Sequence, residues 1–249
     1  MDSMRLLEFP HSHYCEKARW ALDHKAIRFT PIPLMPGIHI ITLRRYVTGS
    51  SVPVLLHNER AIQGSGEIIN YLDNQSSSYP LTPASEELKH ECLRLEASAD
   101  QQLGENIRRI LYHRLLAYPD FIRYCFTHPM PGYKQWLFRF GYPFLRYKIQ
   151  HTYVKSAAAV ALAYKEFDLA MQTLEKQLHG RQYLVGDAFS RTDITVASML
   201  AFIGMPPQHP FPWIDIPDTE IRNFYTRYQQ HPVIIWANSM YQLHRKRST

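Results

Sequence analysis

The order of secondary-structure signals in the N-terminal third of the chain restricts the fold most strongly. An apolar run, Met4–Phe9, ends at Pro10, which is typical of a buried strand because proline supplies no backbone donor. Cys15–His24 follows with apolar residues at helical spacing, and Arg28–Pro33 indicates a second strand. Two consecutive strands joined by a crossover helix are expected to pair in parallel.

The rest of this N-terminal part contains an irregular segment, a hairpin and a helix. Leu34–Thr48 predicts either an irregular turn or a short helix. Val52–His57 and Arg60–Gln63 are short apolar runs on either side of a turn, which predicts an antiparallel hairpin. Ser65–Asn74 predicts a helix with Ser65 as its N-cap. This order of elements resembles the thioredoxin fold.

Strand signals are absent from the rest of the chain. Glu86–Leu116 and Ala157–Leu178 carry apolar residues at spacings of three and four, which predicts two long amphipathic helices. The section between them is expected to break into shorter pieces at its prolines, Pro119, Pro129, Pro131 and Pro143. Further helices are predicted from Ser190, near Asp218 and after Pro232.

A stretch rich in Ser, Pro and Thr separates the two parts, which indicates a linker. We therefore expect an α/β thioredoxin-like N-terminal domain followed by an all-α C-terminal domain. The predicted boundaries are residues 1–76 for the first domain, 77–85 for the linker and 86–249 for the second domain.

The few cysteines restrict the compartment and the chemistry. Cys15, Cys92 and Cys125 are too scattered for a disulfide framework or a zinc site, which favours a reducing compartment. No segment supplies the about 18 uninterrupted apolar residues of a membrane span, and the N-terminus lacks a basic stretch followed by an apolar one. We expect a cytoplasmic protein without a metal site.

The net charge of +6 is unevenly distributed along the chain. Phe121–Lys165 contains no Asp or Glu, and its Lys and Arg residues alternate with aromatic residues such as Trp136 and Phe140. One interpretation is a basic, aromatic surface for a membrane or a nucleic acid. We favour helices whose aromatic side chains pack inward, because no nucleic-acid motif accompanies the charge. No nucleic-acid partner is therefore expected.

The most informative motif is Ser12-His13-Tyr14-Cys15, between a predicted strand and a predicted helix. Free backbone donors and the positive end of the helix dipole stabilise an anion at such a position, and they lower the pKa of a thiol there. The motif resembles Cys-Pro-Tyr-Cys of glutaredoxins, with Ser12 in place of the first cysteine. It also resembles the serine-type and cysteine-type active sites of glutathione transferases. The alternative is that Ser12 is only an N-cap.

Two further motifs are similar to glutathione transferases. In that family the proline that corresponds to Pro53 is cis, so that the residue before it, here Val52, offers its backbone to the cysteinyl part of glutathione. The alternative is a trans proline at the edge of a strand. The third motif is Gly64-Ser65. At these two positions the family has an acid or Gln followed by Ser, and this pair binds the γ-glutamyl end of glutathione. Ser65 suits a carboxylate at a helix start, whereas Gly64 departs from the family pattern.

A fourth motif predicts structure rather than chemistry. Ser190 and Asp193 have the spacing of a capping box, in which each side chain satisfies a backbone donor of the other residue. The sequence around them is similar to a helix start in the C-terminal domain of glutathione transferases. We expect Asp193 to serve folding.

Two histidines, His11 and His13, flank Ser12. An imidazole titrates near neutral pH, so either ring could polarise a bound thiol or accept its proton. Residues two apart in a turn point in different directions, so at most one of them is expected to do so. The simpler expectation is that both face solvent.

The resemblance implies a glutathione transferase that uses glutathione as co-substrate and forms a homodimer. Its implied catalytic residues are Ser12 and Cys15, and the residues implied to bind glutathione are Ser12, Val52, Pro53, Gly64 and Ser65. Ser12 would lower the pKa of the glutathione thiol, which would attack an apolar electrophile held near Tyr112, Trp136 or Phe140. Two alternatives stay open: a glutathione-dependent thiol transferase or lyase that uses Cys15, and a non-catalytic interaction protein with the same fold.

Overall fold

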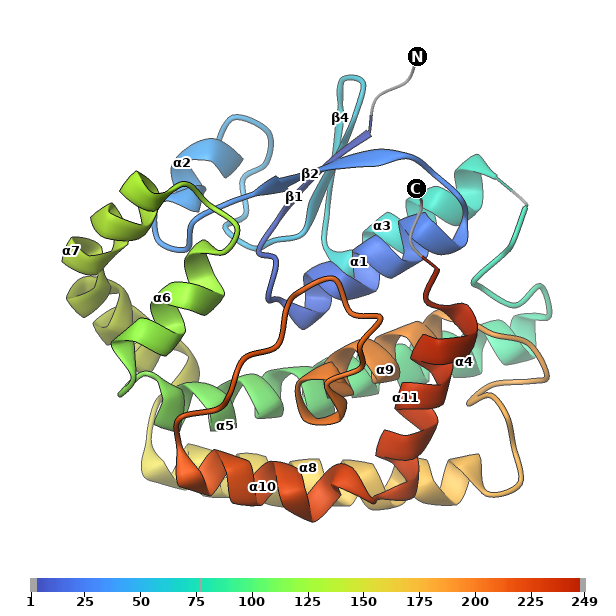
Figure 1. The fold of residues 1–249 in the computed structure, drawn as a ribbon. Coiled ribbons are helices and arrows are strands. Elements are labelled where there is room, and N and C mark those ends of the chain that lie inside the picture. Colours follow the sequence, from blue (N-terminus) through green and yellow to red (C-terminus); the bar gives the residue numbers. More distant parts are fainter. Residues whose placement is uncertain (1–3, 77, 247–249) are drawn as a thin grey trace.

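The computed structural model describes residues 4–76 and 78–246. Residues 1–3, 77 and 247–249, which belong to the predicted domains and linker, lie outside the described part. Figure 1 shows a sheet at one end of the molecule, a layer of helices beneath it, and a helical domain that fills the other end.

The sheet has the strand order β2 (Phe29–Pro33), β1 (Met4–Glu8), β3 (Val54–His57) and β4 (Arg60–Gln63). β1 pairs in parallel with β2 and antiparallel with β3, and β3 and β4 form the predicted hairpin. The N-terminal domain therefore has the expected thioredoxin-like fold. Its helices are α1 (His13–His24), α2 (His39–Leu43) and α3 (Ser65–Gln75).

Alternating side chains of β1 enter two different cores, as the two-residue period of a strand requires. Leu6 belongs to the main core, which also contains Trp20 of α1 and Ile68 of α3 and continues into the C-terminal domain. Leu7 belongs to a smaller core that includes Leu43 of α2. The sheet therefore lies between α2 on one face and α1 and α3 on the other (Figure 1).

The C-terminal domain is all-helical, as predicted. Its central helix is α9 (Arg191–Gly204), which is buried along nearly its whole length and packs against α1, α4 and α11. The other helices are α4 (Glu86–Ala99), α5 (Asn106–Leu115), α6 (Pro119–Thr127), α7 (Gly132–Ile149), α8 (Ala157–Leu178), α10 (Thr219–Gln229) and α11 (Pro232–His244), with π-helical turns η1 (Asp100–Glu105) and η2 (Gln150–Val154).

The boundary between the domains falls between α3 and α4. In this interval Asp73 accepts hydrogen bonds from the backbone of Leu81 (3.1 Å) and Thr82 (3.0 Å), so the connecting chain is attached to the end of α3. We retain the division at residues 77–85 as a proposal.

The predicted helix Glu86–Leu116 is interrupted by the π-helical turn η1, which joins α4 to α5. The Tyr14 hydroxyl donates to the carbonyl oxygen of Asp100 at 2.7 Å. Gly104 allows close approach there, because a Cβ atom on it would lie 2.6 Å from the Tyr14 oxygen and 2.7 Å from the Met199 sulfur. The π turn therefore accommodates side chains of α1 and α9. The apolar periodicity of Glu86–Leu116 could not predict this interruption, because it depends on residues elsewhere in the chain.

The expectation that Pro143 breaks the helix is wrong. Pro143 lies inside α7, which continues to Ile149. The proline removes the backbone donor for the carbonyl group of Arg139. Both residues are exposed, so water can solvate that carbonyl group. Proline is tolerated here because the lost hydrogen bond faces solvent rather than the core.

The predicted capping box is confirmed. Asp193 accepts a hydrogen bond from the Ser190 backbone at 2.8 Å, and the Ser190 side chain caps the first turn of α9. Asp193 also accepts from the backbone of Leu184 at 2.9 Å and is fully buried. It therefore anchors the loop before α9 as well as the helix start.

The expectation of inward-packing aromatic residues in Phe121–Lys165 is only partly correct. Phe126, Phe138 and Tyr142 are buried. One side of α7 nevertheless exposes a group of large apolar residues, Tyr133, Trp136, Leu137, Phe140, Phe144 and Tyr147. The opposite side of α7 carries the buried Phe138, Tyr142 and Ile149, so these six side chains lie away from the core, although Phe144 also borders the cavity described below. Among the described residues, no helix combines the length and the apolar character needed to cross a membrane.

Candidate active site

A cavity of about 430 Å³ lies between the two domains. Its N-terminal wall is formed by the turn before α1, the segment around α2 and the residues that precede β3. Its C-terminal wall comes from α5, α6, α7, η2 and α9. The lining includes Phe9, His11, Ser12, His13, Tyr14, His39, Val52, Arg108, Leu111, Tyr112, Phe126, Phe144, Lys148, Tyr153 and Phe202.

Ser12 lies in this cavity at the N-terminus of α1. Its backbone N–H donates to Phe9 O at 2.9 Å, which forms the turn between β1 and α1. Its hydroxyl oxygen accepts from the Cys15 backbone N–H at a long 3.4 Å. Ser12 is therefore both an N-cap and a half-buried hydroxyl at the cavity wall, so the cap does not exclude a second role.

Cys15 does not line the cavity. Its side chain is fully buried, and its sulfur accepts the backbone N–H of Phe9 at 3.4 Å. Burial raises the pKa of the Cys15 thiol to about 12, with a further increase from the negative charge of Glu8. At neutral pH the thiol is therefore protonated, and of these two residues only Ser12 lines the cavity.

The peptide bond between Val52 and Pro53 is cis, as the resemblance implied. Val52 lines the cavity beside Ser12. The Pro53 carbonyl accepts from the Gly64 N–H at 3.0 Å. The structure therefore brings Ser12 and Val52 to one cavity and connects the start of α3 to it through Pro53.

Ser65 is not the N-cap that the sequence predicted. Gly64 caps α3 with φ 98°, a left-handed conformation that glycine adopts readily, and Ser65 is the first helical residue. Ser65 is buried at this helix start. The Gln63 side chain donates to Ser51 O at 2.8 Å and so holds the loop before Pro53. Ser65 and the Gly64 turn are outside the cavity lining but adjoin it through that loop.

The expectation that His11 and His13 face solvent is wrong. His11 stacks between Phe9 and Phe126, with ring centroids 5.9 and 4.6 Å apart, and His13 packs against Tyr14. Burial lowers the pKa of His11 to about 4 and that of His13 to about 3. Both rings are neutral near pH 7 and are poor acceptors for a thiol proton.

Sequence reasoning missed Arg108, which provides a positive charge in the cavity wall. Its guanidinium carbon lies 4.3 Å from the centre of the Tyr153 ring and 5.8 Å from that of the Tyr14 ring. Its Nε atom is buried and has no hydrogen-bond partner. No Asp or Glu is among the described residues that line the cavity. Helical periodicity carries no signal for such a side chain.

Of the three aromatic residues expected near an electrophile, only Tyr112 lines the cavity. Trp136 and Phe140 are 61% and 67% exposed on the outer side of α7. These two residues therefore lie outside the cavity lining, whereas α7 contributes other residues to it, including Phe144 and Ile149.

A buried ionic network crosses between the domains behind the site. Lys17 of α1 pairs with Glu96 at 2.7 Å and Asp100 at 2.8 Å, and Glu96 also pairs with Arg191 at 2.6 Å. Arg191 donates to the carbonyl oxygen of Gly66 at 3.1 Å. Arg191 is the first residue of α9, where a positive charge is unfavourable because of the helix dipole. This unfavourable position is a signal in the sequence that Arg191 has an acidic partner.

Among the described residues, no group of three or more His, Cys, Asp or Glu side chains could hold a metal ion. The site offers instead a helix N-terminus with a hydroxyl group, the backbone before a cis proline, and a second helix start. These are donors for an anionic or peptide-like ligand.

The fold and this site define a class: a thioredoxin-like domain joined to an all-helical domain with a ligand cavity between them. Residues 6–80 match the family profile described as glutathione S-transferase, N-terminal domain, and residues 135–232 match that of the glutathione S-transferase C-terminal domain. The two matches cover more than half of the chain, and the protein belongs to the glutathione S-transferase family.

Solved structures of the family have the same fold at low sequence identity. A glutathione S-transferase of Methylobacillus flagellatus KT with glutathione bound is 19% identical, with a TM-score of 0.63 over 99% of this chain and 98% of its own. The β-etherase LigF of Sphingobium sp. strain SYK-6 is 17% identical, with a TM-score of 0.62 over 95% and 98% of the two chains. A glutathione S-transferase of Ceriporiopsis subvermispora in complex with glutathione is 14% identical, with a TM-score of 0.64 over 96% and 95%. A search of curated protein sequences gave no match.

Proposed function

We propose that this protein binds glutathione as co-substrate at the N-terminal wall of the cavity and activates its thiol through Ser12. The observation that carries the proposal is Ser12 itself, a half-buried hydroxyl at the N-terminus of α1 that lines the cavity beside Val52. The backbone of Val52 would bind the cysteinyl part of the peptide next to the cis Pro53. Ser65 and the N-terminus of α3, after Gly64, would bind the γ-glutamyl carboxylate.

Ser12 would donate a hydrogen bond to the sulfur of glutathione and stabilise its anion, with help from the dipole of α1. The thiol proton would leave to water, because His11 and His13 have pKa values too low to retain it. The sulfur lone pair would then form a bond to an electrophilic carbon, and the leaving group would depart with the bonding electrons. Catalysis would consist of positioning and nucleophile activation.

The second substrate would occupy the C-terminal wall. Its side chains are mainly apolar and aromatic, including Leu111, Tyr112 and Phe202, which supports an apolar electrophile. Arg108 adds a cation between the Tyr14 and Tyr153 rings. This guanidinium would bind an oxygen of the electrophile, most strongly that of a carboxylate.

A second candidate function is a non-catalytic interaction protein. The observation that favours it is Gly64, which supplies no side chain for the amino group of glutathione at the position where the family has an acid or Gln. The exposed apolar side of α7 also fits an interaction role. A thiol transferase that uses Cys15 is less well supported, because that thiol is buried and protonated at neutral pH.

Two broader proposals accompany this function. All three cysteines are free, which is compatible with a reducing, cytoplasmic location. A homodimer is proposed from the family resemblance.

The proposed activation can be tested by titrating the thiolate absorbance of bound glutathione. In Ser12→Ala we expect the pKa of the bound thiol to rise by about 1 to 2, because one charge-assisted hydrogen bond is lost. The rate near neutral pH should fall, and the affinity for glutathione should change little.

Ser156→Ala is the matched control. Ser156 caps α8 in the same way, through a 3.2 Å bond from the Ala159 N–H, but it lies outside the cavity lining. If the bound thiol has the same pKa in the wild type and in Ser12→Ala, Ser12 serves only as an N-cap of α1. Failure of the wild type to be retained on immobilised glutathione would favour the interaction protein.

A further inference from the structure

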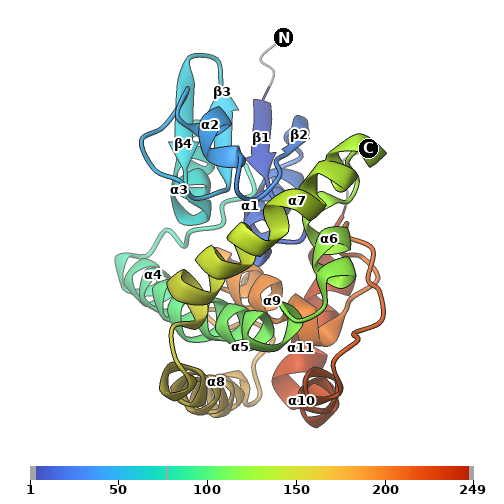
Figure 2. The same ribbon diagram turned by 90° about the vertical axis from the view of Figure 1, so that its left-hand side faces the viewer.

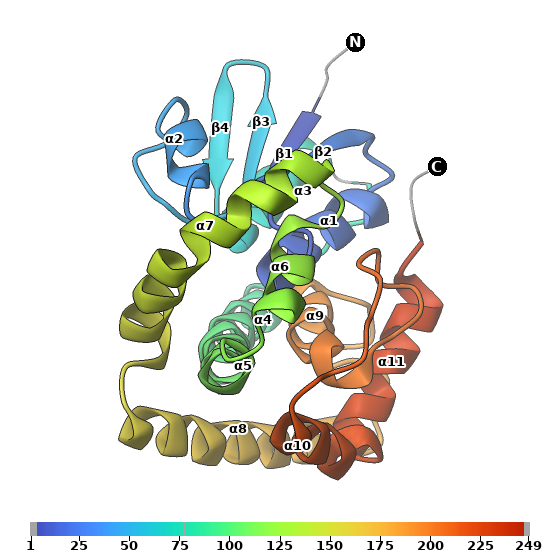
Figure 3. The same cartoon turned by 60° about the vertical axis from the view of Figure 1, so that its left-hand side comes forward.

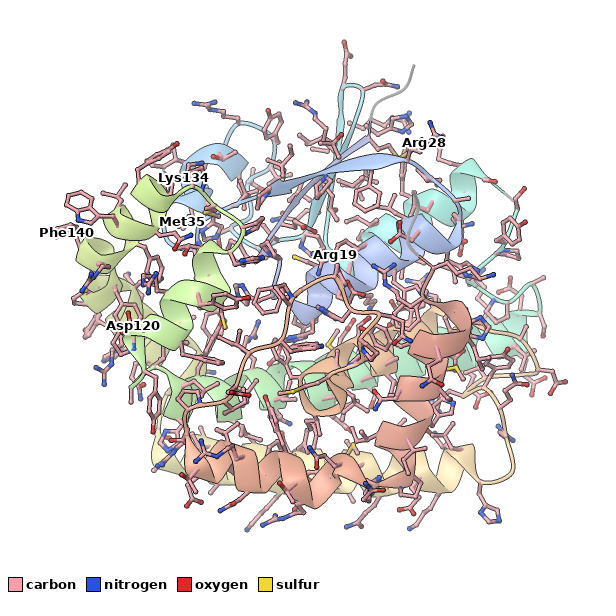
Figure 4. The ribbon with its side chains drawn as sticks, in the orientation of Figure 1. Arg19, Arg28, Met35, Asp120, Lys134 and Phe140 are labelled. Atoms are coloured by element: carbon pink, nitrogen blue, oxygen red, sulfur yellow. The ribbon has the colours of Figure 1, made fainter. Side chains whose placement is uncertain are left out.

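The outer side of α7 carries a continuous apolar stripe. Its six members are between 49% and 68% exposed: Tyr133, Trp136, Leu137, Phe140, Phe144 and Tyr147. At about 100° per residue these positions fall within an arc of about 100° of the helix. Figures 2 and 3 show α7 crossing the outside of the molecule from the N-terminal domain toward the start of α8. In Figure 4 the Phe140 ring points away from the rest of the protein.

Cations flank the stripe on both sides. Lys134 and Lys148 lie on one side of it by the same helical geometry, and Arg139 and Arg146 lie on the other. None of the four forms an ion pair within residues 4–76 and 78–246. Because Phe121–Lys165 contains no Asp or Glu, no acidic side chain of this segment offsets them. The surface is thus apolar along its centre and positive at both margins.

This charge pattern argues against a second copy of the chain as the occupant. A two-fold contact brings the same patch from each copy together, so it would oppose cations with cations. A single-stranded nucleic acid is bound by a basic groove that follows its backbone, whereas this stripe lies on the outside of a helix. An aromatic stripe between rows of Lys and Arg matches a helix that lies in the headgroup region of an anionic bilayer.

We propose that the outer side of α7 binds the surface of membranes that contain anionic phospholipids. The aromatic rings enter the interface between headgroups and acyl chains, and the four cations contact lipid phosphates and carboxylates. Phe144 and Lys148 belong both to this surface and to the cavity lining. Membrane binding would therefore bring one wall of the cavity close to the lipid, where apolar compounds dissolve.

The test is flotation of the full-length protein with vesicles of phosphatidylcholine alone and of an equimolar mixture of phosphatidylcholine and phosphatidylserine. We expect binding to the mixed vesicles, weakened by salt, and little binding to phosphatidylcholine. Trp136→Ser combined with Phe140→Ser should lower the partition coefficient about ten-fold or more. Arg139→Glu combined with Arg146→Glu should lower it at least about five-fold for each cation lost.

The matched controls replace exposed apolar and basic residues on other helices with the same residue types, Ser and Glu. Leu162 and Leu169 of α8 are 53% and 63% exposed, and Arg94 of α4 is also exposed. Leu162→Ser with Leu169→Ser, and Arg94→Glu, should leave the partition coefficient unchanged. All replaced residues lie at the surface, and thermal melting checks that the fold is intact.

Three kinds of result would overturn the proposal. The first is loss of the expected specificity, seen either as equal binding to both vesicle types or as no effect of the variants of α7. The second is a dimer that dissociates in the Trp136 and Phe140 variant without vesicle binding by the wild type, which would assign the stripe to a second copy. The third is a shift of a single-stranded oligonucleotide that depends on Arg139 and Arg146, again without vesicle binding.

Discussion

At the scale of single residues, the cavity has a positive electrostatic character. Arg108 and Lys148 line it, and no carboxylate is among its described lining residues. The positive charge of Arg108 also contributes to the low pKa of His13, after burial, which is the larger cause. Three kinds of donor therefore surround the space where a thiolate and its electrophile would meet: a guanidinium, a hydroxyl and a helix N-terminus.

Arg108 should determine which electrophiles react. Arg108→Met keeps much of the side-chain length and removes the charge. We expect kcat/KM for an aromatic electrophile that carries a carboxylate to fall about 10- to 100-fold, because a hydrogen bond to a charged group is lost. A neutral electrophile of the same shape should lose much less. Equal losses for both compounds would show that Arg108 only supports the fold of the cavity.

Ser65 should contribute affinity for glutathione rather than rate. Ser65→Ala removes a buried hydroxyl at the start of α3. Binding measured by calorimetry should weaken by about 1 to 3 kcal/mol. Ser85→Ala is the control, since Ser85 precedes α4 as an exposed serine whose side chain makes no capping bond. Unchanged affinity in Ser65→Ala with an intact fold would remove Ser65 from the site.

At the scale of helices and strands, local capping decides where several elements begin. The start of α9 depends on Asp193, which accepts from the backbone of both Ser190 and Leu184 while fully buried. The start of α8 depends on an exposed serine, Ser156. A buried backbone donor that loses its partner cannot form a hydrogen bond with water instead. Loss of the Asp193 cap should therefore destabilise the protein more than loss of the Ser156 cap.

Asp193→Ala should lower the free energy of unfolding by about 1 to 3 kcal/mol, through loss of the cap and an unsatisfied Leu184 donor. Ser156→Ala should cost about 1 kcal/mol or less. Urea denaturation followed by circular dichroism measures both. A normally stable Asp193→Ala protein that fails to bind glutathione would contradict the structural assignment.

Elements with local causes could be predicted from the sequence, and elements with distant causes could not. The capping box at Ser190, the hairpin β3-β4 and helix α8 follow from residues within a few positions of one another. The π turn η1 depends on Tyr14, far away in the sequence, and the continuity of α7 depends on the exposure of Pro143. The position of Ser12 at a helix start follows from its local sequence, whereas Arg108 reaches the cavity only through packing between helices.

At the scale of the whole molecule, buried and half-buried histidines connect stability to pH. Burial lowers the pKa of His11, His24 and His209 to about 4 and that of His13 to about 3. An unfolded chain binds these protons at the ordinary pKa of 6.5. Between these values the unfolded state therefore holds more protons than the native state.

The native state should accordingly lose stability as the pH falls from about 6.5 toward 4, by up to about 1.4 kcal/mol per pH unit for each of the buried His11, His13 and His209. The half-buried His24 should contribute less, because solvent screens its charge. His11→Phe keeps an aromatic ring between Phe9 and Phe126. In this variant the slope of the unfolding free energy against pH should correspond to about one proton fewer taken up on unfolding. Denaturant titrations at a series of pH values give the slope. The same slope in wild type and variant would mean that His11 titrates normally in the folded protein.

The hydrogen bond from Arg191 to the Gly66 carbonyl joins the central helix of one domain to the first turn of α3 in the other. Ser65 directly precedes Gly66 in the chain. A ligand bound at Ser65 and the ionic network of Lys17, Glu96 and Arg191 would therefore contact the same short backbone segment. With glutathione bound at Ser65 as proposed, we expect the free energies of ligand binding and of domain attachment to be coupled, equally in both directions. A substitution that loosens α9 would weaken the tripeptide complex from a distance, and a bound tripeptide would tighten the attachment of the helical domain by the same amount.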